Sequence, residues 1–270
     1  MPVNHYENFP VASLLLPRHL RKPIEAIYVF ARSADDFADE GARTDAERLS
    51  LLEGYRQSLK RIEAGDRDDL PPMFKELARW IDAHQLPLSL FHDLLDAFSQ
   101  DVTVKRYANF HDLLDYCRRS ANPVGRLLVH LNQRQSEQTL AWSDAICSAL
   151  QLINFWQDIA IDWQKGRVYL PQEDLARFGV HEDDIAKSEA GAAWQALMLH
   201  QCRRSREMLE SGRPLCRALP GRMGYELRFI LAGGNAVLDK IEAARGDVFR
   251  QRPVLGTLDW IRRAPAALFG

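Results

Sequence analysis

Two pairs of aspartates in this chain are each separated by four residues. The first pair is Asp35 and Asp39, and the second pair, Asp158 and Asp162, follows a strongly apolar segment. Residues four apart lie one turn apart on the same face of an α-helix, so both carboxylates of a pair point the same way. Mg²⁺ prefers such hard oxygen ligands together with water and substrate phosphate oxygens. The spacing therefore indicates metal-assisted chemistry on a phosphorylated substrate.

Other polar residues extend each pair along its helix face. Tyr28 and Arg32 precede the first pair at helical steps, and Gln151 and Asn154 precede the second. Burying carboxylates in an apolar helix costs several kcal/mol unless they are paired or bind a cation. One such pair is commonly a solvated helix face, whereas two favour a cation site. We expect Mg²⁺, or Mn²⁺ in its place, to be held by Asp35, Asp39, Asn154, Asp158 and Asp162, with Arg32, Lys165 and Arg167 near the phosphate oxygens.

The segments that carry these acids are predicted to be helical. Apolar residues recur at helical spacing along nearly the whole chain, and alternating strand-like runs are almost absent. Breakers and caps divide the chain into helices over about 24–40, 74–84, 88–101, 109–119, 136–162, 182–216 and 220–245, with a Thr44–Glu47 capping signal, a kink at Pro123 and a loop at 164–181. We predict one all-α domain of roughly ten helices over residues 1–270.

Composition narrows the classes of function. The chain has 270 residues, 35 Lys and Arg against 37 Asp and Glu, and a net charge of −2, which does not favour nucleic-acid binding. Its four cysteines form no CxxC pair, which favours reduced thiols over a zinc or redox site. The chain contains no apolar run long enough to span a bilayer and no secretory leader pattern, so we expect a cytoplasmic protein.

The motifs resemble the squalene/phytoene synthase family. Both acidic motifs match the family in order and spacing, and so does the run Arg167-Val-Tyr169-Leu-Pro171. The runs at 5–18 and 117–125 and the run Gly233-Gly234-Asn235 are similar to the branch of the family that forms hydroxysqualene in bacterial hopanoid pathways. The resemblance covers roughly residues 5–255.

This resemblance implies an isoprenoid synthase fold around a central cavity. It implies presqualene diphosphate and water as substrates, hydroxysqualene and diphosphate as products, and no NADPH. A presqualene diphosphate synthase upstream and an oxidoreductase downstream are the implied protein partners. Together with the polar residues that extend each acidic pair, the resemblance assigns catalysis to Asp35, Asp39, Asp158, Asp162, Tyr169 and Asn154. It assigns substrate binding to His5, Phe9, Tyr28, Arg32, Gln151, Arg167, Arg118 and Asn122.

Several residues keep two interpretations. His5 either hydrogen-bonds diphosphate or caps the first helix, and Tyr169 either orients water or packs in the core. One of Arg250 and Arg252 would contact phosphate, but the sequence does not say which. Polar residues at the kink, Ser120 and Asn122, could line the substrate site or satisfy freed backbone groups. The tail at 255–269 either packs as a terminal helix or lies on the inner membrane surface.

Three departures from the family pattern favour the hydroxysqualene-forming step. Gln157 stands where relatives often have arginine, Arg118 where aromatic residues are frequent, and Gly233-Gly234 where bulkier residues occur. These changes argue against the condensation of two prenyl diphosphates and leave the later, hydroxysqualene-forming step unaffected. The alternatives are a head-to-head synthase that condenses farnesyl diphosphate and, from another class, a non-catalytic helical scaffold.

Overall fold

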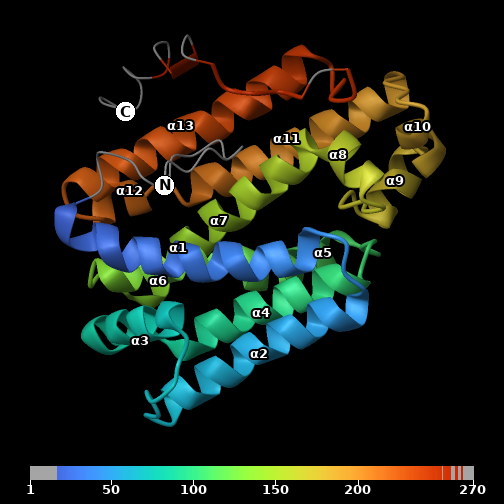
Figure 1. Ribbon diagram of the computed structural model, residues 1–270. Coiled ribbons are helices and arrows are strands. Elements are labelled where there is room, and N and C mark those ends of the chain that lie inside the picture. Colours follow the sequence, from blue (N-terminus) through green and yellow to red (C-terminus); the bar gives the residue numbers. More distant parts are fainter. Residues whose placement is uncertain (1–16, 251, 257–258, 261–262, 264–270) are drawn as a thin grey trace.

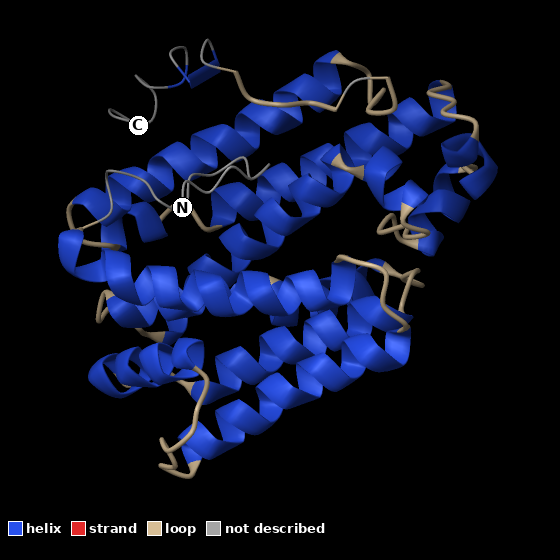
Figure 2. Cartoon of the chain, viewed as in Figure 1, coloured by secondary structure: helices blue, strands red, loops and turns tan. Residues whose placement is uncertain are grey.

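The computed structural model describes residues 17–250, 252–256, 259–260 and 263, and within them the regular structure is α-helical (Figure 1, Figure 2). The first helices are α1 (Arg18–Asp39), α2 (Asp45–Glu63), α3 (Pro72–His84), α4 (Leu88–Thr103), α5 (Phe110–Ser120) and α6 (Asn122–Leu131). The remaining ones are α7 (Glu137–Gln157), α8 (Ile159–Gln164), α9 (Gln172–Phe178), α10 (Glu182–Ala186), α11 (Ala192–Ser211), α12 (Leu215–Ala218) and α13 (Arg222–Ala243). The prediction of an all-α fold is confirmed.

Local signals set several helix ends as expected. Thr44 caps α2, since its hydroxyl accepts from the Glu47 backbone N–H and the Glu47 carboxylate accepts from the Thr44 backbone N–H. The kink before Pro123 separates α5 from α6. By contrast, α1 begins six residues earlier than the predicted start at 24 and contains Pro23. Pro23 is the sixth residue of α1, so the helix lacks the hydrogen bond that a backbone N–H at this position would donate to His19.

The helices form two groups with α1 between them (Figure 1). On one side α1 packs against α2, α3 and α4, and on the other side lie α7, α11 and α13, where α7 contacts both other helices. Buried aromatic side chains fill both groups, among them Phe30, Phe74 and Phe91 on one side and Trp156 and Trp194 on the other. This packing brings the C-terminal ends of α1 and α7 to the same end of the molecule, close to α8 (Figure 1).

The segment at 164–181 packs onto this end, as its apolar content predicts. Val168, Leu170 and Leu175 are buried, and an isolated β-bridge joins Val168 to Arg106. The described residues beyond α13 also pack on the protein: Asp259 pairs with Lys240 at 2.7 Å, and Arg263 pairs with Asp239. These contacts favour the packed interpretation of the described part of the tail. Among the described helices, none combines the length and apolarity needed to cross a bilayer.

Candidate active site

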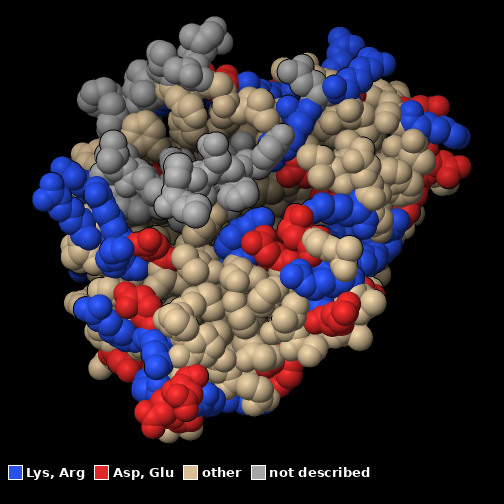
Figure 3. Space-filling view, viewed as in Figure 1, with Lys and Arg blue, Asp and Glu red and all other residues tan. Residues whose placement is uncertain are grey.

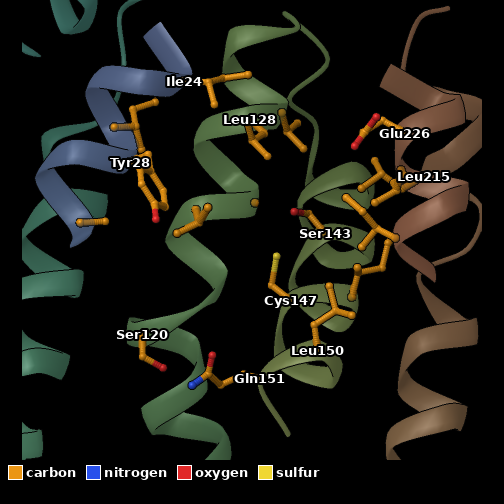
Figure 4. Close-up of a pocket in the computed structure, with 18 of the residues that line it drawn as sticks. Ile24, Tyr28, Ser120, Leu128, Ser143, Cys147, Leu150, Gln151, Leu215 and Glu226 are labelled. Atoms are coloured by element: carbon orange, nitrogen blue, oxygen red, sulfur yellow. The ribbon is translucent and has the colours of Figure 1, made fainter. Parts of the chain in front are cut away.

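A cavity of about 500 Å³ lies between α1, α6, α7 and the α12–α13 pair (Figure 4). Its wall is mostly aliphatic, because the faces of these helices that meet here carry isoleucine, leucine, valine and methionine. These residues include Ile24, Ile27, Leu128, Val129, Ile146, Leu150, Leu215, Leu219, Met223 and Ile230. The cavity thus offers an apolar space of the size that suits a hydrocarbon chain.

The polar lining residues include members of both sets of polar residues that the sequence places on the helix faces of the two acidic pairs. Tyr28, Arg32 and Asp35 come from α1, and Gln151 comes from α7. Arg32 Nη1 lies 3.3 Å from Asp35 Oδ2, and its other terminal nitrogen lies 2.7 Å from Asp36. Burial, together with the charge of Asp39, raises the pKa of Asp35 to about 7. The first set therefore brings negative charge into the end of an apolar cavity.

Asp39, one turn beyond Asp35, is held by two cations from the segment after α8. Arg167 Nη2 lies 2.5 Å from one carboxylate oxygen, and Lys165 Nζ lies 3.2 Å from the other. Burial by itself would raise the pKa of Asp39, but the hydrogen bond and charge of Arg167, with Lys165, bring it below its usual range. The two acidic motifs are thus joined through the segment that follows the second one.

In the second motif, the two acids lie on either side of a helix break. The sequence predicts one helix over 136–162, but α7 ends at Gln157 and α8 starts at Ile159, so Asp158 occupies the junction. Arg252 binds both carboxylate oxygens of Asp158, one of them at 3.1 Å. Burial and the charge of Asp158 raise the pKa of Asp162 to about 7, and Asp39 acts in the same direction. The motifs therefore share one electrostatic environment.

A buried hydrogen-bonded group around Asp101 of α4 supports this site. Tyr116 donates a 2.5 Å hydrogen bond to Asp101 Oδ2, and Tyr169 donates a 3.4 Å bond to Oδ1. Burial raises the pKa of Asp101 to about 6. The Tyr169 ring stacks on Phe155, with centroids 3.7 Å apart and planes at 6°. The group connects α4, α5, α7 and the segment that carries Arg167.

The donor set fits a hard divalent cation in its chemistry. Four carboxylates and the Asn154 amide offer oxygen ligands, and burial, with a neighbouring aspartate, raises the pKa values of Asp35 and Asp162. Within the described part of the chain, no three His, Cys, Asp or Glu side chains are grouped closely enough to form a ready metal centre. The residues thus suit Mg²⁺ or Mn²⁺ bound together with an anionic ligand that adds oxygen donors.

Among the predicted substrate-binding residues that the structure describes, Arg118 and Asn122 do not line the cavity. The Arg118 side chain is 52% exposed on α5 and pairs with Asp115 at 3.0 Å. Asn122 is buried, and its side-chain oxygen accepts a 2.8 Å hydrogen bond from Ser148, which ties α6 to α7. His5 and Phe9 lie outside the described residues.

The other departures from the family pattern serve helix packing. A Cβ at Gly234 would come 3.0 Å from Leu209 and 3.1 Å from Leu150, so the glycine lets α13 approach α11 and α7 closely. The Gln157 amide donates to the Pro253 carbonyl and thereby anchors the segment that carries Arg252. Neither residue lines the cavity as described.

Sequence reasoning missed Asp101 and Tyr116. Asp101 lies in an apolar helix with no second acid at helical spacing, so no local pattern marks it. Tyr116 directly precedes the run at 117–125 that resembles the family, and it lines the cavity. That neighbourhood is the one signal that could have drawn attention to it.

Comparison with known proteins settles the family. The model of the squalene/phytoene synthase family matches residues 3–259. This chain belongs to the squalene/phytoene synthase family. Hydroxysqualene synthase from Zymomonas mobilis is 35% identical over 228 residues, which cover 83% of this chain and 75% of the relative. 15-cis-phytoene synthase from Synechococcus elongatus is 29% identical over 274 residues, which cover 97% of this chain and 88% of the relative.

A solved structure of the family has the same fold. Squalene synthase HpnC from Alicyclobacillus acidocaldarius superposes with a TM-score of 0.83 at 36% identity, covering 89% of this chain and 90% of that one. Membership of the squalene/phytoene synthase family indicates an isoprenoid synthase, and the predicted fold is confirmed. On the face drawn in Figure 3, Lys and Arg are interleaved with Asp and Glu, and the described residues form no broad basic area there.

Proposed function

We propose that the protein converts presqualene diphosphate and water to hydroxysqualene and diphosphate. The observation that carries the proposal is the cavity itself, whose aliphatic wall meets Arg32 and Asp35 of the first acidic motif. A prenyl diphosphate has the same division between a long hydrocarbon part and a compact charged group. The 35% identity to a hydroxysqualene synthase supports this choice of substrate within the family.

Basic residues around the acids would bind the diphosphate. Arg32, Lys165, Arg167 and Arg252 all lie against carboxylates of the two motifs and can pair with phosphate oxygens through charge-assisted hydrogen bonds. We propose that Asp35, Asp39, Asn154, Asp158 and Asp162 hold Mg²⁺ or Mn²⁺, which when bound would supply Lewis-acid stabilisation of the leaving diphosphate.

The rest of the cavity would protect the cation that forms when diphosphate leaves. Its mostly aliphatic wall would offer few groups that hold water, which would otherwise capture the cation before it rearranges. The rings of Tyr28, Phe98 and Tyr116 line the same space, and each ring face can stabilise a cation by about 0.5–2 kcal/mol. After rearrangement and opening of the cyclopropane ring, one water adds to give the alcohol, and no nicotinamide is needed.

The test is a product assay with purified protein and Mg²⁺, without nicotinamide, run in parallel on presqualene diphosphate and on farnesyl diphosphate. Hydroxysqualene from the first substrate and no product from the second is the expected result. Presqualene diphosphate or a carotenoid precursor made from a prenyl diphosphate would instead support the condensing alternative, which the phytoene synthase relative favours. No turnover of either substrate would favour the scaffold alternative.

A further inference from the structure

Ser120 is an unusual residue within this cavity. It is the last residue of α5, at the break before α6, and its hydroxyl oxygen is buried without a hydrogen-bond partner among the described residues. The side-chain oxygen of Asn122, the second polar residue at the break, accepts a hydrogen bond from Ser148. Buried hydroxyls are almost always hydrogen-bonded, so an orphaned one indicates a water or ligand that completes it. The Ser120 hydroxyl therefore does not serve to satisfy a backbone group freed by the break between α5 and α6.

Gln151 faces the same part of the cavity from α7. In Figure 4 the Ser120 hydroxyl and the Gln151 amide point toward one another at one end of the pocket. A hydroxyl can donate and accept, and a primary amide offers both a donor and an acceptor. Together they provide the two polar partners that a bound water requires.

Two other polar side chains of the cavity, Ser143 and Cys147, already have a hydrogen-bond partner. The Cys147 thiol is hydrogen-bonded by the Ser143 side chain and by the backbone of Gly125. A Cβ at Gly125 would lie 2.4 Å from both side-chain atoms, which shows how closely the three residues pack. Ser143 thus lines the cavity with its polar group engaged, and it serves as a matched comparison for Ser120.

We propose that Ser120, with Gln151, holds the water molecule that adds to the carbocation. This inference rests on the proposed function. Ser120 lies one helical turn from Tyr116 and lines the same cavity as Asp35. The substrate's C–O bond breaks with its electron pair on diphosphate, the water oxygen forms the new C–O bond to the ring-opened cation, and the surplus proton passes to diphosphate.

The experiment compares Ser120→Ala, Ser120→Thr and Ser143→Ala with the wild type on presqualene diphosphate. Diphosphate release measures ionisation, and the organic products are separated and quantified, with ¹⁸O-labelled water marking the added oxygen. In Ser120→Ala we expect diphosphate release within about three-fold of the wild type, while the fraction of hydroxysqualene falls by about ten-fold and elimination hydrocarbons replace it. Ser120→Thr retains the hydroxyl and should restore hydroxysqualene, and Ser143→Ala should keep the wild-type products.

Thermal melting separates this role from a structural one. Because no described residue is hydrogen-bonded to the Ser120 hydroxyl, Ser120→Ala should leave the melting temperature unchanged or higher. An unchanged product distribution in Ser120→Ala would overturn the inference and leave the proposed function standing. Equal loss of diphosphate release and hydroxysqualene would also overturn it, because ionisation and not water capture would then be affected. If the wild type forms no hydroxysqualene, the proposed function itself fails.

Discussion

Arg252 binds both carboxylate oxygens of Asp158, although 94 positions separate the two residues in the chain. Arg250, two positions earlier, is 86% exposed, and among the described residues it pairs with Asp247, at 3.4 Å. The sequence leaves open which of the two arginines serves the site, and the structure places Arg252 there. A segment that follows the last long helix thus completes the charge balance of the second acidic motif.

Replacing Arg252 should therefore impair catalysis. Arg252→Ala removes a cation from Asp158 and from the region proposed to bind diphosphate, so we expect kcat/KM for presqualene diphosphate to fall by at least about ten-fold. Arg250→Ala is the matched control and should stay within about two-fold, because its side chain is solvated. Steady-state kinetics on both variants check this, and equal effects of the two substitutions would contradict the assignment.

The acidic motifs should be essential for turnover and dispensable for folding. Asp35→Asn and Asp158→Asn each remove a negative charge but keep nearly the same shape, so we expect turnover to drop by at least about a hundred-fold while the helical circular dichroism spectrum is retained. Asp82→Asn, on an exposed pair with Arg67, is the control for a general charge effect. Near-normal turnover in either motif variant would rule that acid out as an essential ligand.

Binding of diphosphate with Mg²⁺ should stabilise the native state. A ligand that binds only the folded protein at about a hundred times its Kd adds about 2.7 kcal/mol, which corresponds to a rise in Tm of roughly 5–10 °C. Differential scanning fluorimetry with Mg²⁺, with diphosphate, with both, and after chelation measures the effect. The rise should need both components and should be absent in Asp158→Asn; a scaffold without a site would show no rise.

Asp101 should make the stability of the protein depend on pH. Burial raises its pKa in the native state to about 6 from the usual 3.8, so the native state binds more protons than the unfolded state between these values. The contribution of this group to stability is therefore greatest below about pH 4 and is lost as pH rises through 6. The loss amounts to about 3 kcal/mol, at 1.36 kcal/mol per unit of pKa.

Asp101→Asn removes that pH dependence. The free energy of unfolding of the variant relative to the wild type should increase by up to about 3 kcal/mol between pH 4 and pH 7. Urea titrations of both proteins at several pH values measure the difference, and Asp82→Asn again provides the control. A difference that is constant with pH would show that Asp101 ionises normally in the native state.

Substitutions of the two tyrosines that donate hydrogen bonds to Asp101 should distinguish a residue that only packs in the core from one that acts in the cavity. Tyr169 stacks on Phe155, and its hydroxyl makes a long 3.4 Å bond, whereas Tyr116 lines the cavity and makes a 2.5 Å bond. We expect Tyr169→Phe to keep activity within about three-fold and Tyr116→Phe to lose about ten-fold. Tyr169→Ala should cost about 3–5 kcal/mol of stability because the stacked ring is lost. Greater loss of activity in Tyr169→Phe would support the catalytic interpretation of Tyr169.

The sequence by itself determined the features that depend on neighbours along the chain. Helical periodicity predicts the all-α class, and the Thr44–Glu47 signal predicts the start of α2, because capping and periodicity act over one or two turns. The same locality explains the acidic pairs, since four residues fix the relative direction of two side chains. Helical periodicity does not locate the short helices: the segment 182–216, predicted as one helix, is divided into α10, α11 and α12.

Only the tertiary structure decided which distant residues meet. The pairing of Arg252 with Asp158, of Arg167 with Asp39, and of Tyr116 with Asp101 depends on how whole helices pack, and no short-range pattern encodes it. The exposed position of Arg118 was hidden for the same reason. Packing also determines which polar groups are left unsatisfied, and so the isolated hydroxyl of Ser120 becomes visible only once α5, α6 and α7 enclose the cavity.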